Sequence, residues 1–222
     1  MENGRVTPET VVDILSLFIR VIIEQIWYQF ELYPRESFNK YTFYGFQVNS
    51  SRHPGVISYL DEFVKNLKKL MKNGLITRLF LEIFSNKKCK YSFGFSFKNS
   101  LLFEQLKNDT QFIDFDYSSN EMFDSFTLIN ELKSLLYSII NDYSNLSIEN
   151  SNEVGNFKIL ISTTDDLQIS SNNDWIMEKH NNISDNNSTQ NDEFFWNVDL
   201  NSFKNVDLGY LKIRSYLAVH KN

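Results

Sequence analysis

Apolar side chains recur with a helical period near the start of the chain. Between residues 11 and 30 they leave little polar face, which predicts a helix covered on most sides and lying at the centre of the core. Thr7 can cap this helix and Pro8 suits its first position. Because Pro34 forces the residue before it out of helical backbone, we predict that the helix ends near Glu31.

Two further patterns follow along the next part of the chain. Aromatic residues between positions 43 and 48 predict a strand. An amphipathic helix is expected to begin after Pro54-Gly55 and to end at Asn73-Gly74. Residues 75–84 and 90–97 flank a polar turn, and aromatic residues alternate along the second of these segments. This pattern predicts a β-hairpin with one aromatic face.

The pattern changes in the second half of the chain. A third helix is expected at 121–143 and a strand at 157–163, but 164–193 is dominated by Asn, Asp and Ser. Such a segment has too few apolar groups to offset its ordering entropy. Apolar residues return at 194–198 and 208–219, so we expect the C-terminal end to rejoin the sheet. The fold class predicted is α+β, with three helices packed on a mainly antiparallel sheet.

Composition narrows the class of protein. The 222 residues fit one domain with a long appendage, and the lone Cys89 cannot form an internal disulfide. Charged residues interrupt the only long apolar segment, so no membrane span is expected, and the polar N-terminus lacks the features of a signal peptide. A formal net charge of −6 argues against nucleic-acid binding by the whole chain.

Basic residues nevertheless cluster between positions 65 and 90. Some of them could meet phosphate, which would suit a small DNA-binding protein, whereas the alternative is a solvated helix face and hairpin. The members of the cluster are Lys65, Lys68, Lys69, Lys72, Arg78, Lys87, Lys88 and Lys90.

The sequence offers little support for catalysis, and no cofactor or metal is expected. It has no Gly-rich phosphate loop and no paired-Cys spacing, and His53, His180 and His220 lie far apart. A thiol nucleophile at Cys89 is the one enzymatic alternative. We expect His53 to form a turn, and the acidic pair at 114 and 116 to be solvated.

The stretch at 31–60, ELYPRESFNKYTFYGFQVNSSRHPGVISYL, carries a family resemblance. Two X-Pro breaks bracket its aromatic strand, and each adjoins a helix. With the hairpin, the third helix and FKILIST in the same order, the chain resembles the HORMA family. The resemblance implies one HORMA domain over 1–222, with a core at about 7–163 and a safety belt at about 164–222 that closes over a partner's extended peptide.

Within that family the chain most resembles the accessory, non-catalytic subunit of DNA polymerase zeta. The Ser51-Arg52-His53-Pro54 turn, Tyr59 and the terminal LGYLKIRSYLAVHKN carry this likeness. It implies an adaptor that joins the polymerase's catalytic subunit to the deoxycytidyl transferase in DNA damage tolerance. Such an adaptor is expected in the nucleus, and a cytoplasmic fraction is compatible with this role. A spindle-checkpoint HORMA adaptor is the alternative, and a DNA-binding protein is the further one.

The same resemblance assigns residues to partners. Tyr59 and Trp175 would contact a Pro-containing peptide of the catalytic subunit, and three residues of the terminal strands would bind the transferase's C-terminal domain: Leu200, Arg214 and Tyr216. From the residues alone, Tyr59 could equally pack on the chain's own core, which is also the alternative for Trp175. Tyr137 stands where the family carries a dimerising arginine, which puts homodimerisation by that route in doubt.

Overall fold

The computed structural model describes residues 7–108, 124–142, 146, 155–164 and 198–220. Its α-helices are α1 (Pro8–Gln29), α2 (Pro54–Lys72), α3 (Leu101–Lys107) and α4 (Ser125–Asp142). Its strands are β1 (Phe38–Phe43), β2 (Phe46–Ser51), β3 (Ile76–Ser85), β4 (Lys88–Ser96), β5 (Asn156–Thr163), β6 (Val198–Ser202), β7 (Val206–Asp207) and β8 (Lys212–His220).

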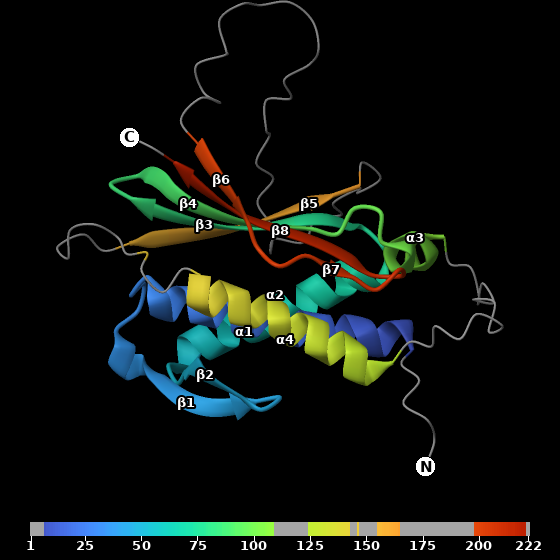
Figure 1. The fold of residues 1–222 in the computed structure, drawn as a ribbon. Coiled ribbons are helices and arrows are strands. Elements are labelled where there is room, and N and C mark those ends of the chain that lie inside the picture. The colour runs from blue at the N-terminus through green and yellow to red at the C-terminus, as the bar shows by residue number, and fades with distance from the viewer. Residues whose placement is uncertain (1–6, 109–123, 143–145, 147–154, 165–197, 221–222) are drawn as a thin grey trace, which may run out of the picture.

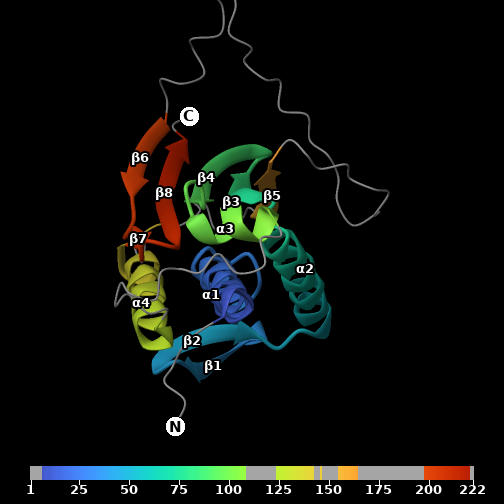
Figure 2. The same cartoon turned by 90° about the vertical axis from the view of Figure 1, so that its right-hand side faces the viewer.

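One antiparallel sheet organises the molecule. Its strands lie in the order β5-β3-β4-β8-β6, with β7 also paired to β8. Helices α1, α2 and α4 lie on one face of this sheet, and the β1–β2 hairpin lies on the far side of α1 (Figures 1 and 2). The predicted α+β class, with helices on a mainly antiparallel sheet, is confirmed.

Helix α1 is the central element, as predicted. The Thr7 side chain accepts a hydrogen bond from the Thr10 amide at 3.3 Å, and Pro8 occupies the first turn. The helix ends at Gln29, where the Phe30 amide donates to the Ile26 carbonyl at 3.0 Å. Figure 2 shows why its surface is apolar almost all round, because the sheet, α2, α4 and the β1–β2 hairpin surround it.

The single strand predicted at 43–48 is wrong, because the chain turns back in the middle of that segment. Tyr44 and Gly45 have φ angles of 46° and 84°, a left-handed backbone that reverses the chain and pairs β1 with β2. The aromatic residues around the turn pack on α1, where the Phe18 ring lies 4.8 Å from Phe43 and 5.5 Å from Tyr44 between centroids. Packing on the central helix therefore explains the aromatic run.

The helices of the second half differ in detail from those expected. Helix α4 begins at Ser125 because the Asp124 carboxylate accepts hydrogen bonds from the Phe126 and Thr127 amides, both at 3.1 Å. The described residues also contain a fourth helix, α3, which the sequence analysis missed. Its seven residues are too few to show a clear period. Residues 121–123 and 143 of the expected third helix lie outside the described residues.

The aromatic hairpin and the return of the C-terminal end are confirmed. Strands β3 and β4 meet at Asn86 and Lys87, whose φ angles are 51° and 63°, and Phe93 and Phe95 are buried beneath the sheet. Strand β8 pairs with β4, and β6 pairs with β8. The two edge strands of the sheet are consequently β5 and β6.

Candidate functional site

The candidate site lies along β5, at one edge of the sheet. Strand β5 pairs with β3 on one side, and no strand in the described part of the chain pairs with its other side. Alternate backbone N–H and C=O groups of an edge strand point away from the sheet and can pair with an added strand. This edge can therefore hold an extended peptide by backbone hydrogen bonds.

An open hollow of about 480 Å³ lies beside this strand. Its walls come from the α1–β1 connection, the first turns of α2 and the start of β5: Tyr33, His53, Gly55, Val56, Tyr59 and Phe157. Behind it lies the fully buried Trp27, whose ring centroid is 4.6 Å from that of Phe157 and 5.4 Å from that of Tyr33. The hollow is thus lined by aromatic side chains that pack against the buried core.

Tyr59 is the most accessible of the large hydrophobic side chains that line this hollow. Its ring centroid lies 6.2 Å from Trp27 and 6.3 Å from Phe157, yet 45% of the residue remains exposed. Partial burial, with the neighbouring Tyr33 phenol as a smaller cause, raises the pKa of Tyr59. Tyr59 therefore keeps its proton at neutral pH and offers an apolar ring with a hydrogen-bonding hydroxyl. Tyr59 thus rests against the core without being enclosed by it.

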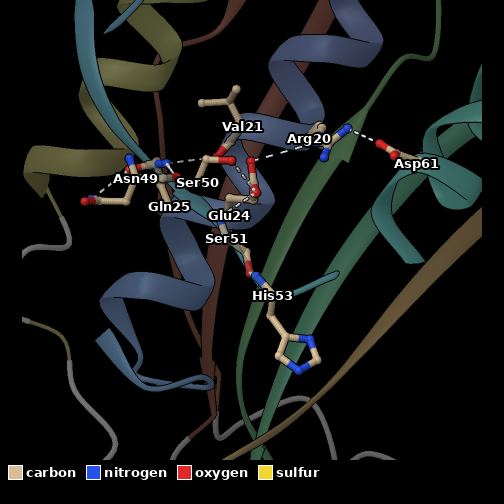
Figure 3. A network of polar contacts seen from close by, with 9 residues as sticks. All are labelled: Arg20, Val21, Glu24, Gln25, Asn49, Ser50, Ser51, His53 and Asp61. Atoms are coloured by element: carbon tan, nitrogen blue, oxygen red, sulfur yellow. Dashed lines mark hydrogen bonds and ion pairs between the residues drawn. The ribbon is translucent and has the colours of Figure 1, made fainter. Parts of the chain in front are cut away.

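A buried carboxylate fixes the turn that leads into the hollow (Figure 3). Glu24 of α1 is only 1% exposed, and its Oε1 accepts hydrogen bonds from the Ser50 hydroxyl and the Ser51 amide, both at 3.0 Å. The Ser51 hydroxyl in turn accepts a bond from the His53 amide at 3.3 Å. Burial is the largest influence on the pKa of Glu24 and raises it, against the opposing hydrogen bonds and the charge of Arg20.

The next residue of α1 holds the same strand. Gln25 Oε1 accepts a hydrogen bond from the Asn49 amide at 3.0 Å, and its Nε2 donates to the Asn49 carbonyl at 2.7 Å (Figure 3). Arg20 connects this network to α2, because it lies near Glu24 and pairs with Asp61. The turn before α2 is therefore positioned by α1 side chains whose structural role no sequence pattern had indicated.

His53 forms a turn, as predicted. It caps the start of α2 through its backbone, since its carbonyl accepts a hydrogen bond from the Ile57 amide at 3.0 Å. Its ring points away from the polar network in Figure 3 and contributes to the wall of the hollow. The sequence did not assign Trp27, Tyr33 and Phe157 to the site. Their aromatic side chains could be read from the sequence, but their contact with one another could not.

The three residues assigned to a transferase partner lie together on the other face of the sheet. Tyr216 pairs with Gly94, Arg214 with Ser96 and Leu200 with Ala218. The side chains alternating with them on β8, Ile213 and Leu217, are buried toward the helices.

The residues assigned to the transferase partner therefore lie apart from the hollow around Tyr59. Leu200 is 68% exposed, and the Tyr216 ring lies over Gly94, where a Cβ would overlap it. Burial raises the pKa of Tyr216, although the nearby Arg78 opposes the shift. Helices α1, α2 and α4 lie on one face of the sheet (Figure 1), and Tyr59 belongs to α2. The strand register places Leu200, Arg214 and Tyr216 on the opposite face.

The basic cluster does not form one surface. Lys65, Lys68, Lys69 and Lys72 lie along α2, whereas Lys87 and Lys88 lie at the β3–β4 turn. Arg78 is near the opposite end of β3 from that turn, roughly 20 Å away at the usual strand rise. The four α2 lysines line one hollow.

Cys89 does not have the properties of a catalytic nucleophile. Its half-buried thiol donates to the Tyr91 carbonyl at 3.6 Å, and burial, with the charge of Glu82 as a smaller cause, raises its pKa to about 12. The thiol is therefore protonated at neutral pH. Among the described residues, no three His, Cys, Asp or Glu side chains come together as metal ligands. No helix in the same residues is long and apolar enough to cross a membrane.

Several residues of the sequence analysis lie outside the described residues. They include Trp175, His180 and the acidic pair at 114 and 116. Tyr137 is described, and it stands 58% exposed on α4 with its ring centroid 6.2 Å from that of Phe46.

Comparison with known proteins identifies the fold. No protein-family model and no curated protein matches the sequence. A chain of the mitotic checkpoint complex has a TM-score of 0.67 at 18% identity, over 95% of this chain and 98% of that chain. Caenorhabditis elegans HTP-1 bound to HTP-3 motif-1 has a TM-score of 0.61 at 10% identity, over 97% of this chain and 93% of that chain.

A second structure of C. elegans HTP-1, bound to a HIM-3 closure motif, also has a TM-score of 0.61, at 12% identity over 97% and 93% of the two chains. These neighbours are HORMA-domain proteins. The chain therefore has the HORMA fold, and the predicted likeness is confirmed at that level.

Proposed function

We propose that this chain is a non-catalytic adaptor that captures an extended peptide of a partner protein along β5. The observation that carries the proposal is the open aromatic hollow around Tyr59, which lies beside a sheet edge that no described strand covers. Adding a strand to such an edge gives affinity through backbone hydrogen bonds, while side-chain pockets give selectivity. The C. elegans neighbours were solved with a motif of another protein bound, which supports this mode.

The hollow suits a proline or another apolar residue of the peptide. Its aromatic walls offer apolar area, and the phenols of Tyr33 and Tyr59 supply hydrogen bonds at the rim. In this proposal the single domain consists of a core at about 7–163 and a belt at about 164–222 that closes over the peptide, with Trp175 packing on it. A closed belt must open before the peptide leaves, so capture should show a slow dissociation rate.

We further propose that the partner is the catalytic subunit of DNA polymerase zeta, which would make the chain a nuclear subunit acting in translesion synthesis. The support is the Ser51-Arg52-His53-Pro54 turn, whose backbone is fixed by Glu24 and which lies at the rim of the hollow. The surface of Leu200, Arg214 and Tyr216 would then receive the C-terminal domain of the deoxycytidyl transferase. Two partners fit on one domain because these surfaces lie on different faces.

A spindle-checkpoint adaptor is the second candidate, favoured by the likeness to a chain of the mitotic checkpoint complex. Both candidates use the same fold, so partner choice separates them. Recovery of a B-family polymerase from damaged cells supports the first, and recovery of checkpoint proteins without polymerase supports the second. Fluorescence microscopy of the tagged chain tests the nuclear location independently.

The direct test measures binding of a Pro-containing peptide from the polymerase catalytic subunit to the purified chain by surface plasmon resonance. Removing an aromatic anchor at the centre of an interface typically costs about 2 kcal/mol, so Tyr59→Ala should weaken binding roughly 30-fold, mainly through faster dissociation. Tyr137→Ala is the matched control, because Tyr137 is similarly exposed but lies on α4. Equal affinity for the Tyr59 and Tyr137 variants would contradict capture at this hollow.

A further inference from the structure

Four lysines of α2 line a second open hollow, together with Asp61. Lys65, Lys68, Lys69 and Lys72 follow the spacing i, i+3, i+4, i+7, so they extend along one side of the helix. The structure thus concentrates positive charge on one surface of a chain whose formal net charge is −6.

Most of this charge is not neutralised by neighbouring side chains. Lys68 Nζ lies 3.0 Å from a carboxylate oxygen of Asp13, and Asp61 is paired with Arg20. Within the described ranges, no acidic side chain forms an ion pair with Lys65, Lys69 or Lys72. The negative end of the helix dipole favours the last two, which lie in the final turn. It does not account for Lys65, which lies one turn before Lys69 and outside the final turn.

We propose that this α2 lysine hollow binds the phosphate backbone of duplex nucleic acid without reading its sequence. From Lys65 to Lys72 the helix advances roughly 10 Å, close to the length over which one strand of a duplex presents three phosphates at about 3.4 Å each. No aromatic side chain lines the hollow, so single-stranded bases have nothing to stack on. Phosphate contact is the interaction that remains.

The composition of the hollow favours a duplex over an anionic membrane. Val64 is the only apolar side chain in its lining, so the surface has no large apolar group to insert among lipid tails. Duplex nucleic acid is therefore the partner that matches both the charge and the polar lining of the hollow.

This site is separate from the peptide-binding hollow. At about 100° per residue, the four lysines lie roughly 180–280° around the α2 axis from Tyr59. The two hollows also share no lining residue. Nucleic acid and peptide can consequently bind together, and failure of either proposal leaves the other intact.

The test is fluorescence anisotropy of a short labelled duplex of mixed sequence, titrated with the full chain between about 50 and 200 mM salt. Lys65→Glu/Lys69→Glu is compared with Lys87→Glu/Lys88→Glu, which changes the net charge equally but lies at the exposed β3–β4 turn. Losing two phosphate contacts should weaken binding roughly 50-fold near 0.1 M salt and make the log–log salt slope shallower by about 1.8. The hairpin variant should stay within about twofold of the parent.

Three outcomes would overturn the proposal: no duplex binding by the parent at low salt, equal loss in both variants, or stronger binding to phosphatidylserine vesicles or polyglutamate than to the duplex. The milder Lys65→Gln/Lys69→Gln variant guards against misfolding by charge reversal. It should retain the parent's melting temperature and still lose duplex affinity. Capture of the Pro-containing peptide should be unchanged in every lysine variant.

Discussion

The buried carboxylate of Glu24 makes the stability of this protein depend on pH in a direction that the structure specifies. At 1% exposure the charge is almost fully removed from water. Two hydrogen bonds, from the Ser50 hydroxyl and the Ser51 amide, partly offset the cost of burying this charge. Arg20 also offsets it from a greater distance, since its Nε lies 3.9 Å from Glu24 Oε2. Because burial is the largest influence and the pKa is raised, Glu24 is protonated more readily in the folded protein than in the unfolded chain.

The sign follows from comparing the folded and unfolded states. A raised folded pKa means that the contribution of Glu24 is fully present below the ordinary value of 4.5 and is lost as pH rises through the folded pKa. Each unit between the two pKa values corresponds to about 1.4 kcal/mol. Glu24→Gln keeps a carbonyl acceptor for the Ser51 amide and does not titrate, so it should be within about 1 kcal/mol of the parent at neutral pH.

Glu24→Ala should behave differently from the glutamine variant. It leaves the buried Ser51 amide without an acceptor and removes the packed side chain, which should lower the free energy of unfolding by about 2–4 kcal/mol. Urea unfolding of the parent and both variants from about pH 4 to pH 8 measures these differences. The parent should lose stability relative to Glu24→Gln as pH rises above 4.5. A gain by the parent would refute the argument, because it would mean that the hydrogen bonds and Arg20 outweigh the cost of burial.

Four further variants test other parts of the chain. Gly74→Ala should lower the free energy of unfolding by about 2–4 kcal/mol in the same urea assay, because Gly74 has a φ of 64° and a Cβ there would overlap the Phe103 carbonyl oxygen. Gly45→Ala is the control: its φ is also positive but the space around it is open, so it should lower that free energy by only about 1–2 kcal/mol. Tyr216→Ala should abolish binding of the transferase domain in a pull-down while peptide affinity changes little, and equal loss of both would indicate one shared site. Trp175→Ala should weaken peptide capture roughly 30-fold in plasmon resonance, whereas unchanged affinity with a much lower melting temperature would make Trp175 a core residue.

The sequence by itself determined the elements whose signals are local. The cap and prolines around α1, the Asn73-Gly74 end of α2 and the alternating aromatic residues of β4 each act within a few residues, so their elements were predicted correctly. Two local elements were missed because their own sequence signals are weak. The Tyr44-Gly45 turn interrupts an aromatic run that looked like one strand. The seven residues of α3 gave no clear period.

Only the tertiary structure decided which residues meet. Trp27, Tyr59 and Phe157 belong to α1, α2 and β5, and their rings come together because those elements pack around one core. Glu24 looked like a charge interrupting an apolar helix, yet it anchors the turn before α2 because the β2 backbone passes beside it. Likewise, basic residues adjacent in sequence were divided between a helix and a hairpin tip. Sequence spacing fixes which side of its own element a residue occupies, whereas contact between elements depends on how the whole chain buries its apolar faces.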